Sequence, residues 1–538
     1  MIKVRPYLHH APVPDGVYFG SARGQLVLSG PPILAGVADK IVPLLETGAT
    51  EDDLVAAVGY EKSRRVVRHI VGSLRDRGLL VDFAKHTAPE PDPAERSAFD
   101  SSVTHLEAYS DDPYAAFARF RAATVAVTGP AAAAEPARRG LRRAGVGTVR
   151  AGDDHIGADV VILIDGDPAT VPAGVPVVPV VRDDRVLLVG PVVSDVDSAA
   201  AWAALRDRVS ARAADAPPVA RPVADALAGA LAARLAFDLV TGLLEPGTAQ
   251  VVHGEQLTAE PVRAGAPVAV AEFTLDDAPV EAEPDHAAVV DALAALRDRW
   301  TGRFAAGPSE LDLPQVPVSQ RELAHRVGAD GSVFAWAYDF ETATVGVALA
   351  ALRGCGPSDA AGLTVETWLL DGALRLLAGR AEELDPIGDD ELHPETRRIA
   401  RIFTGQSGQP YGIGLYHVPG LQWRLARVTA ADGRVLGAAW AAGADLAVRD
   451  ALATALSAAQ VRSLRPEVTA EPPVRTDALV FAAPATVGAL RKQITALAAS
   501  EGRVFHGTAV RGDDVLGDLP IHYGPVAYGP APTGKAEQ

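Results

Sequence analysis

Three arginines recur along one predicted helix within residues 60–80 (YEKSRRVVRHIVGSLRDRGLL). At 100° per residue, Arg64, Arg68 and Arg75 fall within one narrow sector of that helix. Because a guanidinium donates paired hydrogen bonds to a carboxylate, such a row favours a peptide rich in Asp and Glu. The simpler interpretation is a solvated basic face. The acidic background argues for the peptide, since the 538 residues carry 50 Lys and Arg against 68 Asp and Glu, a net charge of −18.

A predicted β-hairpin lies upstream of this helix. Residues 17–20 (VYFG) and 25–30 (QLVLSG) have strand-forming side chains around a turn at 21–24, where Gly24 suits a positive φ. If the second strand has a free edge, its main chain can pair with an extended segment while the neighbouring helix contacts that segment's side chains. The hairpin and the arginine helix together predict a site that captures an extended peptide.

Three helices are expected to position these groups. Thr50 followed by Asp53 is typical of a capped helix start. The third helix has one apolar stripe at i, i+3, i+4 and i+7, made of Val67, Ile70, Val71 and Leu74. The order of strands and helices predicts a winged-helix-like element over residues 1–83, with a first edge strand at residues 2–8.

A winged helix with a basic third helix can also bind DNA. A DNA-binding wing usually follows the recognition helix, whereas here the strands come first. The charge of −18 also argues against a nucleic-acid partner. A DNA-binding regulator is therefore kept only as the weakest alternative.

The middle of the chain has the rhythm of a Rossmann-like domain. Strand candidates alternate with helical segments from residue 123 to residue 193, and an apolar helix is predicted at 221–243 for the core or a homodimer interface. The glycine loop that would bind a nucleotide's phosphates is missing, because Gly129 is followed by Pro130 and a run of alanines. The cluster Asp165-Gly166-Asp167 is interpreted as a turn.

From residue 289 the pattern is α+β, with helices covering antiparallel strands. Its carboxylates are scattered singly and do not form the converging set that Mg²⁺ and ATP require; they are Asp339, Glu341, Glu366, Asp371, Glu391, Glu395, Asp445 and Asp450. The pair His393 and Glu395 has no second ligand at helical spacing. A single cysteine, Cys355, excludes a multi-cysteine zinc site within one chain.

Composition bounds the class of protein. An apolar share of 48% and a charged share of 22% fit a soluble globular chain. The first residues form no signal peptide, and no apolar run approaches the ~18 residues of a membrane span. We therefore expect a cytoplasmic protein without a membrane partner.

The order of these segments resembles the leader-peptide-binding partner proteins of azoline-forming cyclodehydratases, the ocin-ThiF-like proteins of thiopeptide and related thiazole- and oxazole-modified peptide pathways. The hairpin VYFGSARGQLVLSG and the helix VVRHIVGSLRDRGLL are similar to that family's peptide-recognition element. The stretch from VAVTG to ALAGALAARLAFDLVTG resembles its degenerate ThiF domain. The segment WAAGADLAVRDALATALSAAQ resembles the remnant of a YcaO fold.

The resemblance implies a multidomain α/β and α+β fold. It has a winged-helix-like peptide-recognition element, a degenerate ThiF/Rossmann-like domain and a C-terminal degenerate YcaO-like α+β domain. The expected boundaries are a recognition element at 1–83, a linker at 84–100, a ThiF-like domain at 101–260, a linker at 261–288, a YcaO-like domain at 289–520 and a Pro/Gly-rich tail at 521–538.

The function implied is that of a non-catalytic subunit. It would bind the leader of a precursor peptide, expected to be acidic, and present core Cys, Ser and Thr residues to a separate YcaO enzyme that uses ATP and Mg²⁺. A flavin-dependent azoline dehydrogenase is a further implied partner. The chain itself would hold no cofactor, no metal and no catalytic residue. The alternative is an ATP-using ThiF- or YcaO-type enzyme in its own right.

The resemblance also assigns the recognition surface. The strand that would pair with the leader's backbone consists of Gln25, Leu26, Val27 and Leu28. The far wall of the groove would consist of Arg64, Val67, Arg68, Val71 and Arg75. Val67 and Val71 also belong to the apolar stripe, so they serve the core as well.

Three departures from the related sequences bear on activity. Related ThiF-like proteins often carry zinc-binding cysteine pairs after the GPxV turn, and PVVSDVDSAAAWAAL has none. The glycine loop is absent, which puts adenylation in doubt. Catalytic YcaO enzymes end in a proline-rich tail such as PxPxP, whereas this chain has only GPAP near its end.

Overall fold

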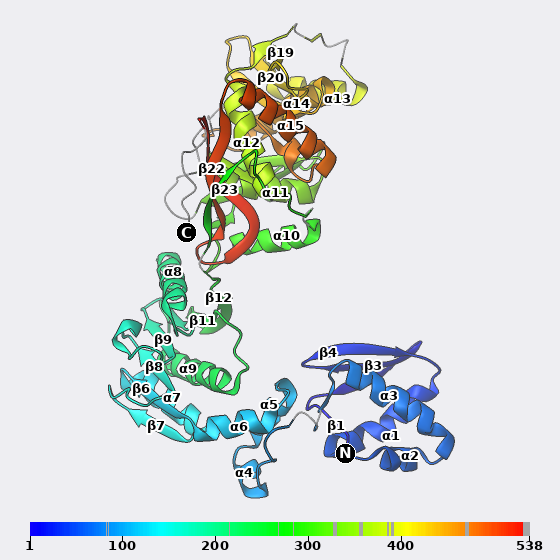
Figure 1. Ribbon diagram of the computed structural model, residues 1–538, viewed down its shortest axis with the longest axis vertical. Helices are drawn as coiled ribbons and strands as arrows, with labels where there is room; N and C mark the ends of the chain where they lie inside the picture. The colour runs from blue at the N-terminus through cyan, green and yellow to red at the C-terminus, as the bar shows by residue number, and fades with distance from the viewer. Residues whose placement is uncertain are drawn as a thin grey trace. The chain divides into compact units, whose positions relative to one another are not determined.

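The computed structural model describes residues 1–530 except 82, 84–85, 215, 267, 283–284, 326–330, 354–358, 385–386, 389–391 and 469–472, so Cys355 and Glu391 lie outside the described residues. The chain divides into two compact units, Met1–Arg263 and Ala264–Gln538 (Figure 1). Each unit has its own buried apolar clusters, and a multidomain α/β fold is thus confirmed.

The first unit begins with an antiparallel sheet packed on three helices. The sheet has the order β2-β3-β4. Its strands are β2 (His9–Val13), β3 (Gly16–Ser21) and β4 (Gly24–Ser29). The helices that follow are α1 (Ile33–Thr47), α2 (Glu51–Val58), the 3₁₀ turn η1 (Glu61–Ser63) and α3 (Arg64–Asp76). Phe19, Ile41 and Leu54 are fully buried between the sheet and the helices.

The local predictions for this element are confirmed. The hairpin turns at Ala22 and Arg23. Thr50 caps α2 in a reciprocal capping box with Asp53. The stripe of Val67, Ile70, Val71 and Leu74 is buried.

The predicted first strand at residues 2–8 differs in the structure. Only β1 (Lys3–Val4) is a strand there, and it pairs with β5 (Leu80–Val81) in a separate two-stranded sheet. Pro6 has no N–H to donate and Tyr7 adopts a φ of 64°, so the chain turns before it reaches β2.

A mixed seven-stranded sheet forms the rest of the first unit, in the order β12-β11-β10-β9-β8-β6-β7. Its strands are β6 (Thr124–Thr128), β7 (Thr148–Ala151), β8 (Val160–Ile164), β9 (Val177–Arg182), β10 (Val186–Val189), β11 (Thr248–His253) and β12 (Thr258–Arg263). The strands β6 to β9 are parallel, as predicted, but β10 to β12 extend the sheet in antiparallel pairs.

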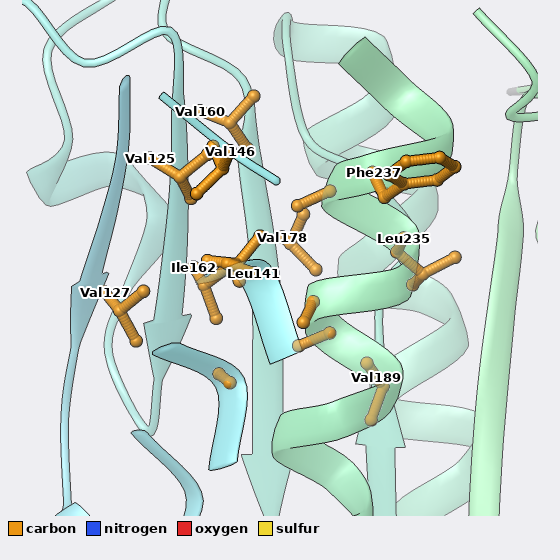
Figure 2. Packing of buried hydrophobic residues seen from close by; sticks show 14 of the residues in the cluster. Val125, Val127, Leu141, Val146, Val160, Ile162, Val178, Val189, Leu235 and Phe237 are labelled. Atoms are coloured by element: carbon orange, nitrogen blue, oxygen red, sulfur yellow. The ribbon is translucent and has the colours of Figure 1, made fainter. Parts of the chain in front are cut away.

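Helices cover both faces of this sheet because successive strand residues point to opposite sides. The helices on the two faces are α5 (Asp100–Tyr109), α6 (Pro113–Ala122), α7 (Ala131–Ala144), α8 (Val196–Ala213) and α9 (Val223–Thr241). The short helix α4 (Pro93–Ala98) precedes α5 and buries none of its residues. Val125 and Val127 face the cluster that includes α7 and α9, whereas Ala126 lies in the cluster that includes Trp202 of α8. Figure 2 shows the first cluster, with Leu235 and Phe237 of α9 labelled.

The described residues of the second unit form three antiparallel sheets. Their orders are β13-β22-β23-β17, β14-β15-β16 and β18-β19-β20-β21. The strands are β13 (Val270–Thr274), β14 (Phe304–Ala306), β15 (Ser319–His325), β16 (Ser332–Ala337), β17 (Asp359–Gly362), β18 (Glu382–Glu383), β19 (Tyr411–His417), β20 (Arg424–Ala430), β21 (Val435–Ala441), β22 (Val504–Asp513) and β23 (Gly517–Gly529).

Apolar helices pack on these sheets, as the α+β rhythm predicted. They are α10 (His286–Ala294), α11 (Phe340–Leu352), α12 (Val365–Ala378), α13 (Pro394–Ser407), α14 (Ala444–Leu464) and α15 (Pro484–Ser500). Helix α12 lies against β17 and β23, and α14 against β20 and β21. None of the helices described in either unit is long and apolar enough to cross a membrane.

Three segments predicted as linkers or tail contain regular structure. Helix α4 lies within 84–100, strand β13 lies within 261–288, and β23 continues through 521–529. Strands β13 and β23 both pair with β22, more than 200 residues beyond β13 in the sequence. Strand β13 therefore has no partner nearby in the sequence, whereas β23 follows β22 directly and forms a hairpin with it.

Candidate peptide-binding site

Strand β4 presents an open main-chain edge. Gly30 N donates to Asp15 O at 2.8 Å, which fixes the alternation of the β3–β4 ladder. Because hydrogen-bonded and non-hydrogen-bonded pairs alternate, the pairs Gly20–Gln25 and Tyr18–Val27 are of the second kind. Gln25 and Val27 therefore turn their N–H and C=O away from β3. Among the described strands β4 pairs with β3 alone, so these groups are available to an added strand.

The opposite edge of the same sheet is interrupted. Ala11 of β2 lies opposite Tyr18 of β3. The main-chain N–H and C=O of Tyr18 point away from β4, so they point towards β2 and bond to Ala11. The outward-facing residues of β2 are then His10 and Pro12. Proline has no N–H, so this edge offers a broken row of donors. Of the two edges, β4 is the one suited to strand addition.

The side chains of β4 divide between the core and the surface. Leu28 is buried and Leu26 is half-buried against the core, whereas Gln25 is exposed and Val27 is 55% exposed. Tyr18 Oη lies 3.4 Å from Gln25 Oε1 on the exposed side. An added peptide would thus meet the main chain of Gln25 and Val27, while Leu28 anchors the strand.

Helix α3 lies beside β4 in the same element (Figure 1). Val67 and Val71 are in its buried stripe and pack into the core. Their side chains stabilise the fold and are not free to contact a ligand. The part of the predicted far wall that is accessible consists of the arginines.

Arg64 forms ion pairs with three carboxylates of the same element. Its Nε lies 2.6 Å from Glu61, and its Nη1 lies 3.0 Å from Glu51 and 2.7 Å from Asp52. These hydrogen bonds, those from Glu61 first, raise the pKa of Arg64 above its usual value. The capping box of Thr50 and Asp53 places the acidic first turn of α2 against this arginine.

Arg68 and Arg75 are more available. Arg68 Nε pairs with Glu51 Oε1 at 2.8 Å, but its side chain is 64% exposed. Hydrogen bonds from Arg68 and Arg64 lower the pKa of Glu51. Arg75 is exposed in the last turn of α3 and has no ion pair with any described residue. The structure brings Arg64 and Arg68 together at Glu51, and leaves Arg75 apart from them.

The sequence analysis did not predict two features of this site. Glu51 and Asp52 neutralise part of the arginine row, and Pro12 marks the blocked edge. The signal for the first was present, because an acidic turn at residues 51–53 belongs to the helix packed next to α3. The effect of Pro12 on the edge could be predicted only by knowing that β2 is an edge strand.

At the carboxyl edge of the parallel strands in the seven-stranded sheet, Gly129 and Asp165 make close contacts within the fold. Gly129 has a φ of 124° and approaches Ile164 so closely that an added Cβ would lie 2.6 Å from its carbonyl oxygen. Asp165 Oδ2 accepts from Arg182 Nε at 2.8 Å, and Arg182 also pairs with Asp225 at 3.2 Å. Asp167 caps a 3₁₀ turn, so the cluster at 165–167 serves the turn that was predicted.

The carboxylates of the second unit have separate local partners. Asp371 is buried between Arg353 and Arg375, at 2.8 and 3.0 Å. Asp339 caps α11, and Asp450 accepts from Tyr338 Oη at 2.9 Å. Within the described parts of the chain, no group of three or more His, Cys, Asp and Glu side chains could hold a metal ion.

One solved structure is similar to this chain over nearly its whole length. A heterocyclase in complex with substrate and cofactor aligns with 98% of this chain and 94% of its own length, at a TM-score of 0.55 and 12% identity. The chain therefore has a heterocyclase-like multidomain α/β fold, and at this identity the likeness shows the fold alone.

Other comparisons add less. Crystal structures of E. coli MccB with succinimide and with ATP align with 49% of this chain and 96% of their own, at a TM-score of 0.36 and 10% identity, too low to show a common fold. No family model matches the sequence. No curated protein matches it either.

Proposed function

We propose that this chain is the leader-peptide-binding subunit of an azoline-forming cyclodehydratase. It pairs the precursor's leader with the β4 edge and presents the core Cys, Ser or Thr residues to a separate ATP-dependent YcaO enzyme. The open edge at Gln25 and Val27 carries this proposal. A strand edge beside a helix with accessible arginines suits an extended acidic peptide.

Three further observations support a binding role. The whole-chain likeness is to a heterocyclase that was solved with a substrate and a cofactor. Pro130 follows Gly129 after the first strand of the seven-stranded sheet and has no N–H to offer a phosphate, and Asp165 is paired with Arg182. The carboxylates described in the second unit do not converge on a metal site. We also propose that a flavin-dependent azoline dehydrogenase acts on the product.

A reconstitution tests the proposal. The genes beside this one are first searched for a short reading frame with a Cys/Ser-rich C-terminus and for a YcaO gene, whose products serve as precursor and partner. Mass spectrometry follows the loss of water from the precursor with ATP and the partner, with and without this chain. Dehydration that requires this chain and the leader supports the subunit role. Equal dehydration without this chain contradicts it.

A further inference from the structure

A cavity of about 480 Å³ lies in the second unit, lined by the start of α12, by helix α15 and by residues 276–282. Its walls are mainly apolar, and Leu363, Phe481 and Val487 are among the lining residues. The α15 wall is open at Gly488, because a Cβ added there would have no atom within 4 Å. The volume is within the range of small-molecule sites, about 300–1,000 Å³, so the cavity has room for a small molecule.

The carboxylate of Glu366 is accessible in this cavity and lacks a hydrogen-bond donor. Glu366 is the second residue of α12, it lines the cavity, and its side chain is 15% exposed. None of the described residues donates a hydrogen bond to it. Its ion-pair partner, Arg491 Nη1, lies 3.8 Å away, beyond hydrogen-bonding distance. Burial raises the pKa of the Glu366 carboxyl, because apolar walls solvate its charge poorly. A ligand that donates to this carboxylate is therefore favoured.

A second carboxylate lies beside the first. Glu281 Oε2 accepts a hydrogen bond at 3.0 Å from the main-chain N–H of Val365, the residue before Glu366. Glu281 Oε1 lies 3.8 Å from His522 Nε2. Burial lowers the pKa of His522, so its ring is neutral at pH 7. Among the described residues, Arg491 is thus the one permanent cation that pairs with these two carboxylates.

The other charges at the cavity leave this excess of carboxylate in place. Asp276 and Lys492 also line the cavity, and both are exposed. Arg491 is shared with the main chain, because its Nη2 donates to Asp276 O at 2.7 Å. The lining therefore has three carboxylates (Asp276, Glu281 and Glu366) against two cations (Arg491 and Lys492). Such a lining favours a positively charged ligand.

We propose that this cavity binds a cationic amine carried on an apolar body. The ammonium group donates to Glu366, with Glu281 as the neighbouring carboxylate, and the apolar body packs against Phe481 and Val487. An anion of the same size would meet both carboxylates and is disfavoured. The cavity belongs to the second unit and the β4 edge to the first, so this inference does not depend on leader binding.

The test uses the full chain and three probes of similar size. Phenethylamine carries a cation, phenethyl alcohol is its neutral counterpart, and phenylpropionate carries an anion. Ligand-observed NMR titration should show the amine binding about tenfold more tightly than the alcohol, because a hydrogen bond to a charged group is the stronger kind. The anion should bind more weakly than either. Equal binding of the amine and the alcohol, tighter binding of the anion, or no saturable binding of the amine overturns the proposal.

Matched variants locate the site. Glu366→Gln removes the charge and keeps the shape, so it should weaken the amine about tenfold and leave the alcohol unchanged. Glu341→Gln makes the same change at the second residue of α11, outside the cavity, and should alter neither. Gly488→Leu fills the cavity and should abolish amine binding, whereas Gly405→Leu, at another helical glycine with open space around it, should not. Thermal unfolding verifies that each variant is folded. Amine binding that is unchanged in either Glu366→Gln or Gly488→Leu contradicts the assignment.

Discussion

Replacing Val27 by proline separates peptide binding at the β4 edge from the stability of the sheet. Val27 and Tyr18 form a non-hydrogen-bonded pair, so the N–H of Val27 points away from β3. Proline there removes one outward donor and leaves the β3–β4 ladder intact. Edge strands tolerate proline in this orientation, and the exposed side chain of Val27 leaves room for the ring.

The expected loss concerns binding. One main-chain hydrogen bond contributes about 0.5–1.5 kcal/mol, and the pyrrolidine ring also obstructs the edge. We therefore expect Val27→Pro to weaken leader binding by about 1–3 kcal/mol, roughly fivefold to a hundredfold in Kd. Fluorescence anisotropy of a labelled leader peptide measures this, and thermal unfolding monitors the fold.

Two neighbouring substitutions are the controls. Val27→Thr keeps the N–H and the β-branched shape, so leader affinity should stay near that of the wild type. Leu26→Pro removes an N–H that bonds to β3 through the pair with Phe19, and should lower the unfolding temperature. If Val27→Pro binds the leader as tightly as Val27→Thr, the β4 edge is not where the peptide pairs.

Three further predictions concern charge and backbone. Arg75→Ala should weaken the binding of an acidic leader about fivefold, and by less at high salt. Arg64→Ala should instead mainly lower the unfolding temperature, because three carboxylates hold that side chain. Equal losses of leader affinity in the two variants would contradict the assignment. Burial and the neighbouring Arg234 lower the pKa of His105 to about 4. The unfolded chain therefore binds a proton at His105 more readily than the folded chain, and stability should fall as the pH drops from about 6.5 to 4. His105→Gln should flatten the plot of melting temperature against pH in that range. An unchanged plot would refute this prediction. Gly129→Ala should lower the free energy of unfolding by more than about 2 kcal/mol, because the φ of Gly129 is 124° and the added Cβ would overlap Ile164. Gly36→Ala lies at an open helical position in α1 and should raise the free energy of unfolding by about 0.5–1 kcal/mol. Thermal unfolding measures both.

Local patterns predicted local structure well. The hairpin, the Thr50 cap and the stripe of α3 each depend on residues within a few positions of one another, and each is present. Strand β13 was missed because its partner β22 is distant in the sequence, whereas β23 follows β22 directly and was missed because its stretch is rich in Pro and Gly. The antiparallel extension also depends on one distant pairing, that of β10 with β11.

The candidate site was predictable in outline and less so in detail. A helical wheel places Arg64, Arg68 and Arg75 in one sector, but it cannot show that Glu51 and Asp52 of α2 reach the first of them. The same wheel did place Val67 and Val71 in the apolar stripe, and both are buried in the core. Such charges and contacts come from elements packed together, and the packing is set by the fold.

Leader-dependent release of phosphate from ATP by the purified chain alone tests the central claim most directly. Leader binding is verified in the same sample by anisotropy. A recognition subunit without an ATP site of its own predicts saturable leader binding and no phosphate release until the YcaO partner is added. Leader-dependent ATP hydrolysis by this chain alone would contradict the account.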